Sequence, residues 1–574
     1  MSSEVLPILA MNHFILAGLI ILLPLVFLTV RSDSKDDPPS MAETIPFVSN
    51  TFQYMTNSRA FMQRASQALR SKNIVKLRLG PVRVYLIKGG QQIQAMFRKS
   101  TAMSSDKFVI MVLKKLQGSP EQDVARFAND KTGRLKTPEA GFENVPEDQR
   151  YWHTLHQITT KNLSIIENTS QLASKYIDFL GEALEKQPLG EWSTVRVFEY
   201  LRKDMAESAV KSLAGTRLLE INPGFIDQFW KFDGVSHQVL NGLPQWINPK
   251  PARERDKLLA MTEKFLNQEF DKFDWHGLGT DTYWEPTFGC GYSRDLQKWT
   301  YDQNMTMRTR AGFLAMSIFA VNSNTVPVTT WFIMELLKDP GLFDAVRAEA
   351  SEALLIDPQT GKRGFDCQKL ISSPLLQSIY IECMRLHVSI GITREIMEDT
   401  VLDGYRLKKG SLIQAPTNLG HQDDDVWARD GHPASEFWAE RHVRHIQKVD
   451  ETTGEVKIEK MFVMAGKPSD FFPFGGGVSM CPGRHFAKQE ILLTVATLVT
   501  KFDMEILEWT HMDGRKSDRP AKDNEKYFLN AAVPPDRDVR IRWKRLWWPD
   551  GHRKSVITGE RLWKRSRRTG EGSF

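Results

Sequence analysis

Cysteine is scarce in this chain of 574 residues, which contains only Cys290, Cys367, Cys383 and Cys481, far apart and without a Cys-x-x-Cys pair. Their spacing predicts neither a disulfide framework nor a zinc cage. A strong excess of one charge is also missing, because 76 Lys and Arg residues stand against 70 Asp and Glu residues, a formal net charge of +6. This balance does not predict nucleic-acid binding, which concentrates basic residues on one face. Internal repeats are absent as well.

One long hydrophobic run is present, at residues 5–30, VLPILAMNHFILAGLIILLPLVFLTV. As a helix it would be longer than the hydrocarbon core of a bilayer, which is about 30 Å thick. A cleaved signal peptide is the alternative, but no Lys or Arg precedes the run and it is long for the apolar part of such a peptide. Arg31 and Lys35 follow it. We therefore expect a retained single-pass anchor with the rest of the chain in the cytosol.

Hydrophobic periodicity predicts a mostly α fold with minor β structure (α+β). A hairpin is expected over 74–89, around Gly80-Pro81, and short strands over 394–415. Residues 443–470 are charged and are predicted to be a loop-like surface insertion. Helices are expected over residues 147–186, 196–216, 307–337, 341–355 and 366–387.

The stretch FFPFGGGVSMCPGRHFA, residues 471–487, surrounds Cys481 with residues that suit a special backbone. Gly475 to Gly477 permit conformations closed to other residues, and Pro482 suits the first turn of a helix whose N-terminus points at the cysteine. Backbone N–H groups and the helix dipole stabilise an anion there, so a thiolate is expected. Locally, a metal or haem ligand, a reactive nucleophile and a structural thiol all remain open.

Residues 474–483, FGGGVSMCPG, resemble the haem-binding segment of the cytochrome P450 family. Phe474, Gly477, Cys481 and Gly483 stand at the positions that recur in that segment. The resemblance implies that these residues bind haem b and that Cys481 is the proximal iron ligand, whose thiolate favours O–O cleavage.

The resemblance also implies how the chain is divided. We expect a membrane anchor and hinge at residues 1–35, a cytochrome P450 catalytic domain at 36–545 and a basic tail at 546–574. An anchored member of the microsomal type is expected in the endoplasmic reticulum membrane.

Two upstream motifs occur in the order expected for the family. ECMR, residues 382–385, resembles its Glu-x-x-Arg motif, and FWAERH, residues 437–442, resembles the segment whose arginine joins that pair. Residues three apart on a helix share a face, and such pairs are more often solvated. The resemblance instead implies a buried ion-pair lock of Glu382, Arg385 and Arg441.

Further haem contacts are implied at four positions. Arg394 matches a position that often binds a haem propionate, and Trp152 with His156 resembles a Trp-x-x-x-Arg motif in which His replaces Arg. Arg484 is expected either to contact a propionate or to form part of a basic face for an acidic reductase.

The predicted helix 307–337 contains FAVNSNTVPVTTW, residues 319–331. Pro327 has no N–H, so the carbonyl of Ser323 loses its helical partner and the helix is expected to open there. A kinked core helix whose Thr and Asn side chains bond back to the backbone is one interpretation. The family carries an acid and a threonine here that guide protons to oxygen, which implies Thr325 and Asn324 as the catalytic residues.

Asn324 departs from the family pattern, because an amide is not a proton reservoir near neutral pH. The Asn-Thr-x-Pro run resembles the branch that contains the sterol 7α-hydroxylases and, more distantly, prostacyclin synthase.

Together the resemblances imply a membrane-bound haem-thiolate monooxygenase of secondary-metabolite or sterol-like metabolism. It would insert one atom of O2 into a lipophilic terpenoid, steroid, alkaloid or polyketide, with electrons from NADPH through NADPH-cytochrome P450 reductase. Two alternatives remain open. One is a haem-thiolate isomerase or dehydratase that uses a peroxide without a reductase, for which the missing acid beside Thr325 is the argument. The other is a haem-binding sensor without catalysis.

Overall fold

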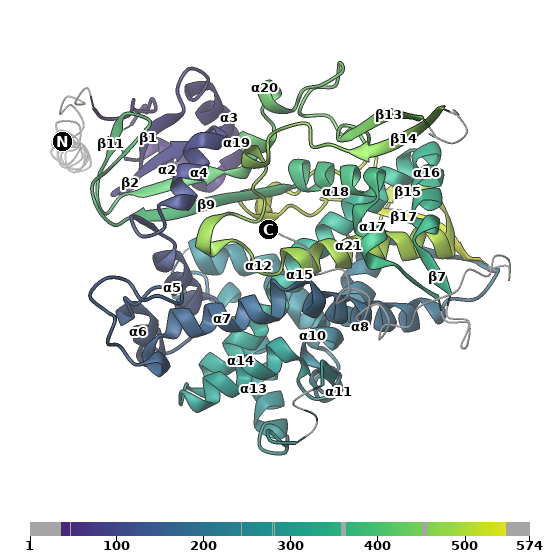
Figure 1. Cartoon of the computed structure of the whole chain (residues 1–574), viewed down its shortest axis with the longest axis horizontal. Helices are drawn as coiled ribbons and strands as arrows, with labels where there is room; N and C mark the ends of the chain where they lie inside the picture. The colour runs from purple at the N-terminus through teal and green to yellow at the C-terminus, as the bar shows by residue number, and fades with distance from the viewer. Residues whose placement is uncertain are drawn as a thin grey trace, which may run out of the picture. The chain divides into compact units, whose positions relative to one another are not determined.

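The computed structural model describes residues 36–546, apart from 46, 243, 278, 280, 281, 357–362 and 450–455. The expected anchor at 1–35 and nearly all of the expected tail lie outside the described residues. The backbone divides into two compact units (Figure 1). Of the described residues, one consists of 36–105 with Gly391–Gly420, and the other of Asp106–Ile390 with 421–546.

The first unit is built around a mixed sheet. The predicted hairpin is present as β1 (Ile74–Leu79) and β2 (Val82–Ile87), antiparallel with Ile74 opposite Ile87. β12 (Leu412–Pro416) runs parallel to β2 and antiparallel to residues Gly391 to Glu395 of β9. The remaining elements of this unit are α2 (Ser49–Thr56), α3 (Ser58–Ala68), α4 (Gly90–Arg98), β3 (Met103–Ser104), β10 (Thr400–Leu402) and β11 (Tyr405–Leu407).

The second unit is mainly helical. Its helices are α5 (Asp106–Lys115), α6 (Glu121–Asn129), α7 (Tyr151–Leu163), α8 (Ile166–Glu185), α9 (Val197–Tyr200), α10 (Ala206–Ala214), α11 (Arg217–Ile221), α12 (Phe225–Asn241), α13 (Lys250–Glu269), α14 (Gly291–Asp302), α15 (Met307–Lys338), α16 (Pro340–Glu352), α17 (Cys367–Ser372), α18 (Pro374–His387), α20 (Asp424–Trp427) and α21 (Arg484–Lys501). Helix α19 (Thr417–His421) ends at the boundary between the units, and β9 (Val388–Ile396) crosses it.

Small sheets complete the second unit. β15 (Phe502–Thr510), β17 (Asp538–Arg545) and β4 (Trp192–Arg196) form one of them, and β16 (Asn530–Ala532) pairs with the first three residues of β9. The two-stranded pairs are β5 (Trp284–Glu285) with β6 (Gly289–Cys290), β7 (Leu354–Ile356) with β8 (Arg363–Phe365), and β13 (Val443–Val449) with β14 (Val456–Phe462).

The prediction of a loop-like insertion at 443–470 is wrong for its first part. β13 and β14 pair antiparallel from Val443 opposite Phe462 to Val449 opposite Val456. Both strands place apolar side chains among the charged ones, and cross-strand pairs of β-branched residues stabilise such a ribbon even when it is exposed.

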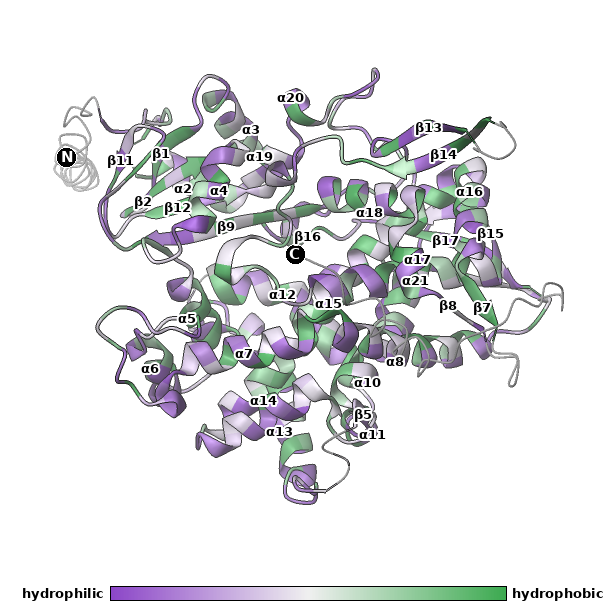
Figure 2. Ribbon diagram, viewed as in Figure 1, coloured by the Kyte–Doolittle hydropathy of each residue, from purple (hydrophilic) through white to green (hydrophobic). Residues whose placement is uncertain are grey.

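Helix boundaries follow local chemistry. Pro374 separates α17 from α18 inside the predicted helix 366–387, because proline cannot continue a helix but fits its first turn. Amphipathic helices such as α8 and α16 alternate hydrophilic and hydrophobic colour along the ribbon (Figure 2). Their apolar stripes are buried in the core of this unit, as expected for helices that cover a core.

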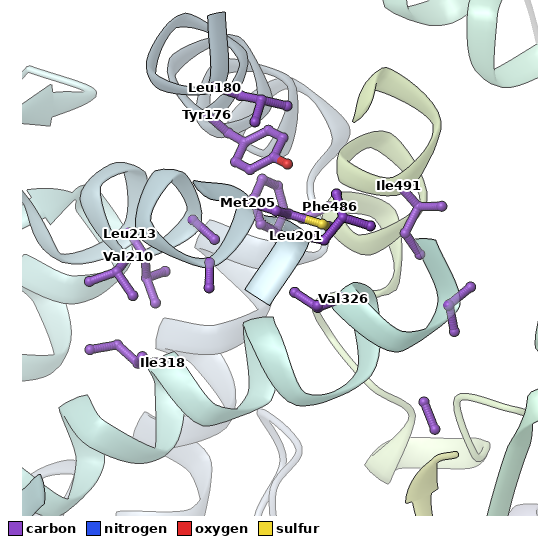
Figure 3. Packing of buried hydrophobic residues seen from close by; sticks show 14 of the residues in the cluster. Tyr176, Leu180, Leu201, Met205, Val210, Leu213, Ile318, Val326, Phe486 and Ile491 are labelled. Atoms are coloured by element: carbon purple, nitrogen blue, oxygen red, sulfur yellow. The ribbon is translucent and has the colours of Figure 1, made fainter. Parts of the chain in front are cut away.

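Helix α15 forms the centre of that core and runs through Pro327 to Lys338, close to the predicted end. Figure 3 shows Ile318 and Val326 of α15 with Val210 and Leu213 of α10, and with Phe486 of α21, in one packed cluster. Among the described residues, α15 is the one helix long and apolar enough to cross a membrane, and most of that stretch is buried in the protein. Its hydrophobicity is therefore that of a core helix.

Candidate active site

Cys481 lies on a loop between the short 3₁₀ turn η5 (Gly477–Ser479) and α21. Gly475 and Gly477 both have positive φ, at 70° and 67°, which L side chains rarely adopt. The loop is closed by its own backbone: the Cys481 N–H donates to the Phe474 carbonyl over 3.0 Å, and the Gly475 N–H donates to the Phe472 carbonyl over 3.0 Å. The glycines are thus needed for the turn that presents the thiol.

The Cys481 side chain is exposed by surface area, yet the atoms around it are dense enough that burial raises the pKa of the thiol. Backbone N–H groups of Gly483 and Arg484 and the Arg484 charge act in the opposite direction, and they only reduce the rise. In the protein alone, burial thus acts against the thiolate that the helix N-terminus favours. The free energy that the thiolate loses with its hydration is larger than the stabilisation that it gains from the helix N-terminus. An adjacent metal cation would supply the remaining stabilisation of the thiolate.

Behind this loop, Glu382, Arg385 and Arg441 form a completely buried ion-pair network. Arg385 binds both oxygens of Glu382, at 2.7 and 3.0 Å, and the Nε of Arg441 lies 2.9 Å from Oε2 of Glu382. Burial acts to raise the pKa of Glu382, but hydrogen bonds from His442 and Arg385 and the charges of both arginines lower it to about 2. The carboxylate is therefore ionised at neutral pH.

His421 connects this network to the cysteine loop. Sequence reasoning missed this connection. Arg385 donates to the His421 carbonyl over 2.8 Å, and the His421 Nε2 accepts the Phe472 N–H over 3.1 Å. Burial and the Arg385 charge lower the pKa of His421 to about 3, so the ring is neutral and Nε2 is an acceptor. A histidine in the polar stretch NLGHQDDD gave no signal of this contact.

We predict that His421→Ala lowers haem content and enlarges the fraction of the reduced, carbon monoxide-treated protein without a thiolate-type Soret band. The substitution leaves the buried Phe472 N–H without an acceptor, at a cost of about 1–3 kcal/mol. Haem assay and carbon monoxide spectra measure both effects. His421→Gln retains an acceptor oxygen and should recover much of the loss; equal defects in the two variants would refute this role.

Helix α7 carries two of the predicted haem contacts, Trp152 and His156, and their side chains have different surroundings. The Trp152 indole N–H donates to the Phe127 carbonyl over 2.9 Å and is already used. His156 instead lines a pocket of about 590 Å³ together with Arg134, His153 and Lys161. Burial and the nearby charges of Arg134 and His153 lower the pKa of His156, so its ring is neutral at physiological pH.

The two predicted arginine contacts lie in different units. The Arg484 side chain donates to the Cys481 carbonyl over 3.1 Å and thereby braces the cysteine loop. Arg394 is in β9 of the sheet-containing unit, opposite Ile413 of β12, and donates to the Thr393 carbonyl over 3.1 Å. The propionate roles of both residues remain predictions.

On α15, Thr325 and Asn324 have backbone partners. The Thr325 hydroxyl donates to the Val321 carbonyl over 2.5 Å, which is the back-bonding expected of a buried helical threonine. The Asn324 Oδ1 accepts the Ala532 N–H over 3.0 Å and so holds β16 against the helix. Beside them Ala320 is exposed in mid-helix, one turn before Asn324.

Comparison with known proteins identifies the family to which this chain belongs. The cytochrome P450 family model matches residues 38–520. This chain belongs to the cytochrome P450 family. It is 45% identical to cytochrome P450 monooxygenase calL of Penicillium decumbens over 518 residues, 90% of this chain and 94% of that protein. It is 30% identical to the 25-hydroxycholesterol 7-alpha-hydroxylase of Rattus norvegicus over 376 residues, 63% of this chain and 81% of that protein.

Among solved structures, the retinoic acid-bound cyanobacterial CYP120A1 has the same fold, with a TM-score of 0.61 and 18% identity over 90% of this chain and 100% of that one. The P450 is a monooxygenase, and the predicted family, mostly α fold and enzyme class are confirmed. The isomerase and the non-catalytic sensor are set aside.

The residues around Cys481 fit the haem that the family implies. Among the residues that the structure describes, no group of three or more His, Cys, Asp or Glu side chains is placed to hold a metal ion. A single cysteine presented on a glycine loop suits a haem, because the porphyrin would supply the nitrogen ligands of the iron and Cys481 would supply the sulfur. The Trp152 indole N–H is already used by the Phe127 carbonyl, and the propionate role of His156 remains a prediction.

Helix α15 of this P450 has a neighbouring residue, next to Thr325, that sequence reasoning missed. Glu490 of α21 is completely buried, and among the described residues neither of its carboxyl oxygens has a well-oriented hydrogen bond. Burial raises its pKa well above the ordinary value, and the nearby Thr325 hydroxyl offsets only part of the rise. Glu490 is therefore a neutral carboxylic acid beside Thr325. A lone acid in the apolar helix FAKQEILLTVATLVT was the available signal.

Proposed function

We propose that this P450 monooxygenase inserts one atom of O2 into a bulky lipophilic molecule such as a terpenoid, steroid, alkaloid or polyketide. The observation that carries the proposal is the P450 family match together with 45% identity to a P450 monooxygenase over 90% of this chain. Beside Thr325, helix α15 presents apolar residues, with Ala320 exposed and Val321 half-buried. Apolar surface with few polar groups favours a lipophilic substrate.

The similarity to a 25-hydroxycholesterol 7-alpha-hydroxylase supports a fused-ring substrate within that class. Cys481 is proposed as the iron ligand, with Phe474, Gly477 and Gly483 shaping its loop and Arg394, His156 and Arg484 as candidate propionate partners. When bound, the haem supplies the iron at which O2 is activated. Thr325 of α15 and the neutral Glu490 beside it hold protons near this helix. Asn324 positions β16.

Electrons are proposed to come from NADPH through NADPH-cytochrome P450 reductase, with residues 1–35 anchoring the protein in the endoplasmic reticulum membrane. Microsomes containing the full chain and the reductase would be supplied with NADPH, ¹⁸O2 and pools of lipophilic metabolites, and products analysed by mass spectrometry. We expect products that carry a single ¹⁸O atom and require both NADPH and reductase. Product formation without electrons, or without ¹⁸O, would contradict the proposal.

A further inference from the structure

A buried carboxyl group from another helix reaches α15 at the residue before Asn324. Asp233 of α12 is 7% exposed, and its Oδ1 accepts a 2.5 Å hydrogen bond from the buried Ser323 hydroxyl. Pro327, four residues after Ser323, has no N–H to offer the Ser323 carbonyl. Helix α15 is thus polar at the point where Asp233 meets it.

The groups that act on the Asp233 carboxyl come from three neighbouring elements. They are Ser323 of α15, Arg202 of the π-helical turn η2 (Leu201–Met205), and Tyr527 of the 3₁₀ turn η6 (Glu525–Tyr527). Burial raises the pKa of Asp233 to about 6, although the hydrogen bond from Ser323, the Arg202 charge and the hydrogen bond from Tyr527 all act to lower it. The carboxyl group therefore exchanges its proton close to physiological pH.

Tyr527 connects this carboxyl group with the protein surface. Its ring is half-buried, lies 5.9 Å from the His237 ring, and follows the exposed Lys526 in the chain. Burial and the Lys526 charge lower the pKa of His237, so that ring is neutral. Polar side chains thus extend from the half-buried Tyr527 to the buried Ser323, with Asp233 between them.

The monooxygenase reaction needs such a route. It converts RH, O2, two electrons and two protons into ROH and water, so protons must reach the oxygen side in each turnover. Asn324 has no proton to exchange near neutral pH, and its carbonyl is occupied by the Ala532 N–H. Glu490 keeps its proton because burial holds its pKa well above the ordinary value.

We propose that Asp233, acting through Ser323, is the proton-holding residue that replaces the acid missing at position 324. In the carboxylate form the Ser323 hydroxyl donates to Asp233 Oδ1, and once Asp233 is protonated this hydrogen bond reverses so that the Asp233 O–H donates to the Ser323 oxygen. As that O–H breaks, the Ser323 oxygen gains the proton and passes its own to a water molecule on the reaction side of α15. The carboxylate then regains a proton from solvent past Tyr527, and no electrons move in either transfer. Asp233 is a positioning residue and does not touch substrate. The inference rests on the electron-driven function proposed above.

The test compares Asp233→Asn with Asp227→Asn, an exposed carboxylate of the same helix, in the holoenzyme with reductase and NADPH. Asparagine can still accept the Ser323 hydrogen bond, so the variant should fold and keep its carbon monoxide spectrum. We expect kcat to fall roughly a hundredfold with KM unchanged, hydrogen peroxide to replace product, and the solvent isotope effect to rise. Asp233→Glu should recover part of kcat, and Asp227→Asn should behave as wild type.

A second readout does not depend on turnover. Infrared difference spectra of the substrate-free holoenzyme between about pH 5 and about pH 8 should show a carboxylic C=O band that disappears with a midpoint near 6 and is missing in Asp233→Asn. Ser323→Ala should move this midpoint upward, because it removes a hydrogen bond that lowers the pKa. An unchanged kcat in Asp233→Asn, an effect confined to KM, or a band unaffected by the substitution would overturn the proposal. If wild type itself needs no electrons, the function proposed above fails, while the infrared result still stands.

Discussion

Replacing Cys481 with serine is expected to abolish the long-wavelength Soret band of the reduced, carbon monoxide-treated protein and to reduce turnover to background. A serine hydroxyl does not provide the soft anionic sulfur that this ligation needs. The described part of the chain offers no cluster of alternative metal ligands. The loop itself should survive, because its closing hydrogen bond comes from the backbone N–H of residue 481 and not from the thiol.

The matched control is Cys367→Ser. Cys367 is half-buried at the start of α17, and burial raises the pKa of its thiol to about 12, so it is a neutral packing residue. The control should leave the spectrum and turnover unchanged. Purified protein, total haem assay and carbon monoxide difference spectra measure the outcome. A Cys481→Ser protein that keeps both the band and product formation would exclude Cys481 as the ligand.

Features that depend on neighbouring residues were predictable from the sequence. The cysteine loop was predictable because its glycines, Pro482 and the following helix act within a few residues of one another. The pairing of Glu382 with Arg385 was predictable because residues three apart on a helix share a face. The core helix α15 was predictable from its continuous apolar composition, with its end two residues before Pro340.

Contacts between distant residues were not predictable from a single sequence. The Asn324 amide is 208 positions from the Ala532 N–H that it binds, and Asp233 is 90 positions from Ser323. The burial of Cys481 could not be predicted for a related reason: dipole and N–H effects are local, whereas burial depends on the packing of the whole unit. Similarly, the exposed β13–β14 ribbon has few of the apolar alternations that mark a half-buried strand.

We expect Glu382→Gln to be the most destabilising conservative substitution in the ion-pair network. The amide has nearly the shape of the carboxylate, but it leaves the guanidinium groups of Arg385 and Arg441 buried without a counter-charge. Removing one partner of a buried ion pair costs about 3–5 kcal/mol. Urea unfolding of the holoenzyme, followed by circular dichroism and haem release, should show a lower midpoint and earlier haem loss.

The lowered pKa of the Glu382 carboxyl group also predicts how the stability of the protein changes in acid. The pKa of Glu382 is lowered to about 2 in the folded protein from an ordinary value of 4.5. Its contribution is therefore complete above about pH 4.5 and is lost as the pH falls toward 2, which is worth about 3 kcal/mol. Wild type should lose this increment across that interval, whereas Glu382→Gln should be less stable at neutral pH and show a shallower acid dependence.

Glu182→Gln is the control for the substitution itself, because Glu182 is an exposed residue of α8. It should change the free energy of unfolding by less than about 0.5 kcal/mol. If Glu382→Gln were no less stable than Glu182→Gln, the buried arginines would have to be satisfied by their carbonyl partners alone. Arg385 and Arg441 do donate to the carbonyls of His421 and Trp427, over 2.8 and 2.7 Å, but a carbonyl dipole does not neutralise a full charge inside the protein. The difference between the two variants therefore measures what the Glu382 carboxylate contributes, both its charge and the acceptor oxygen that the amide lacks.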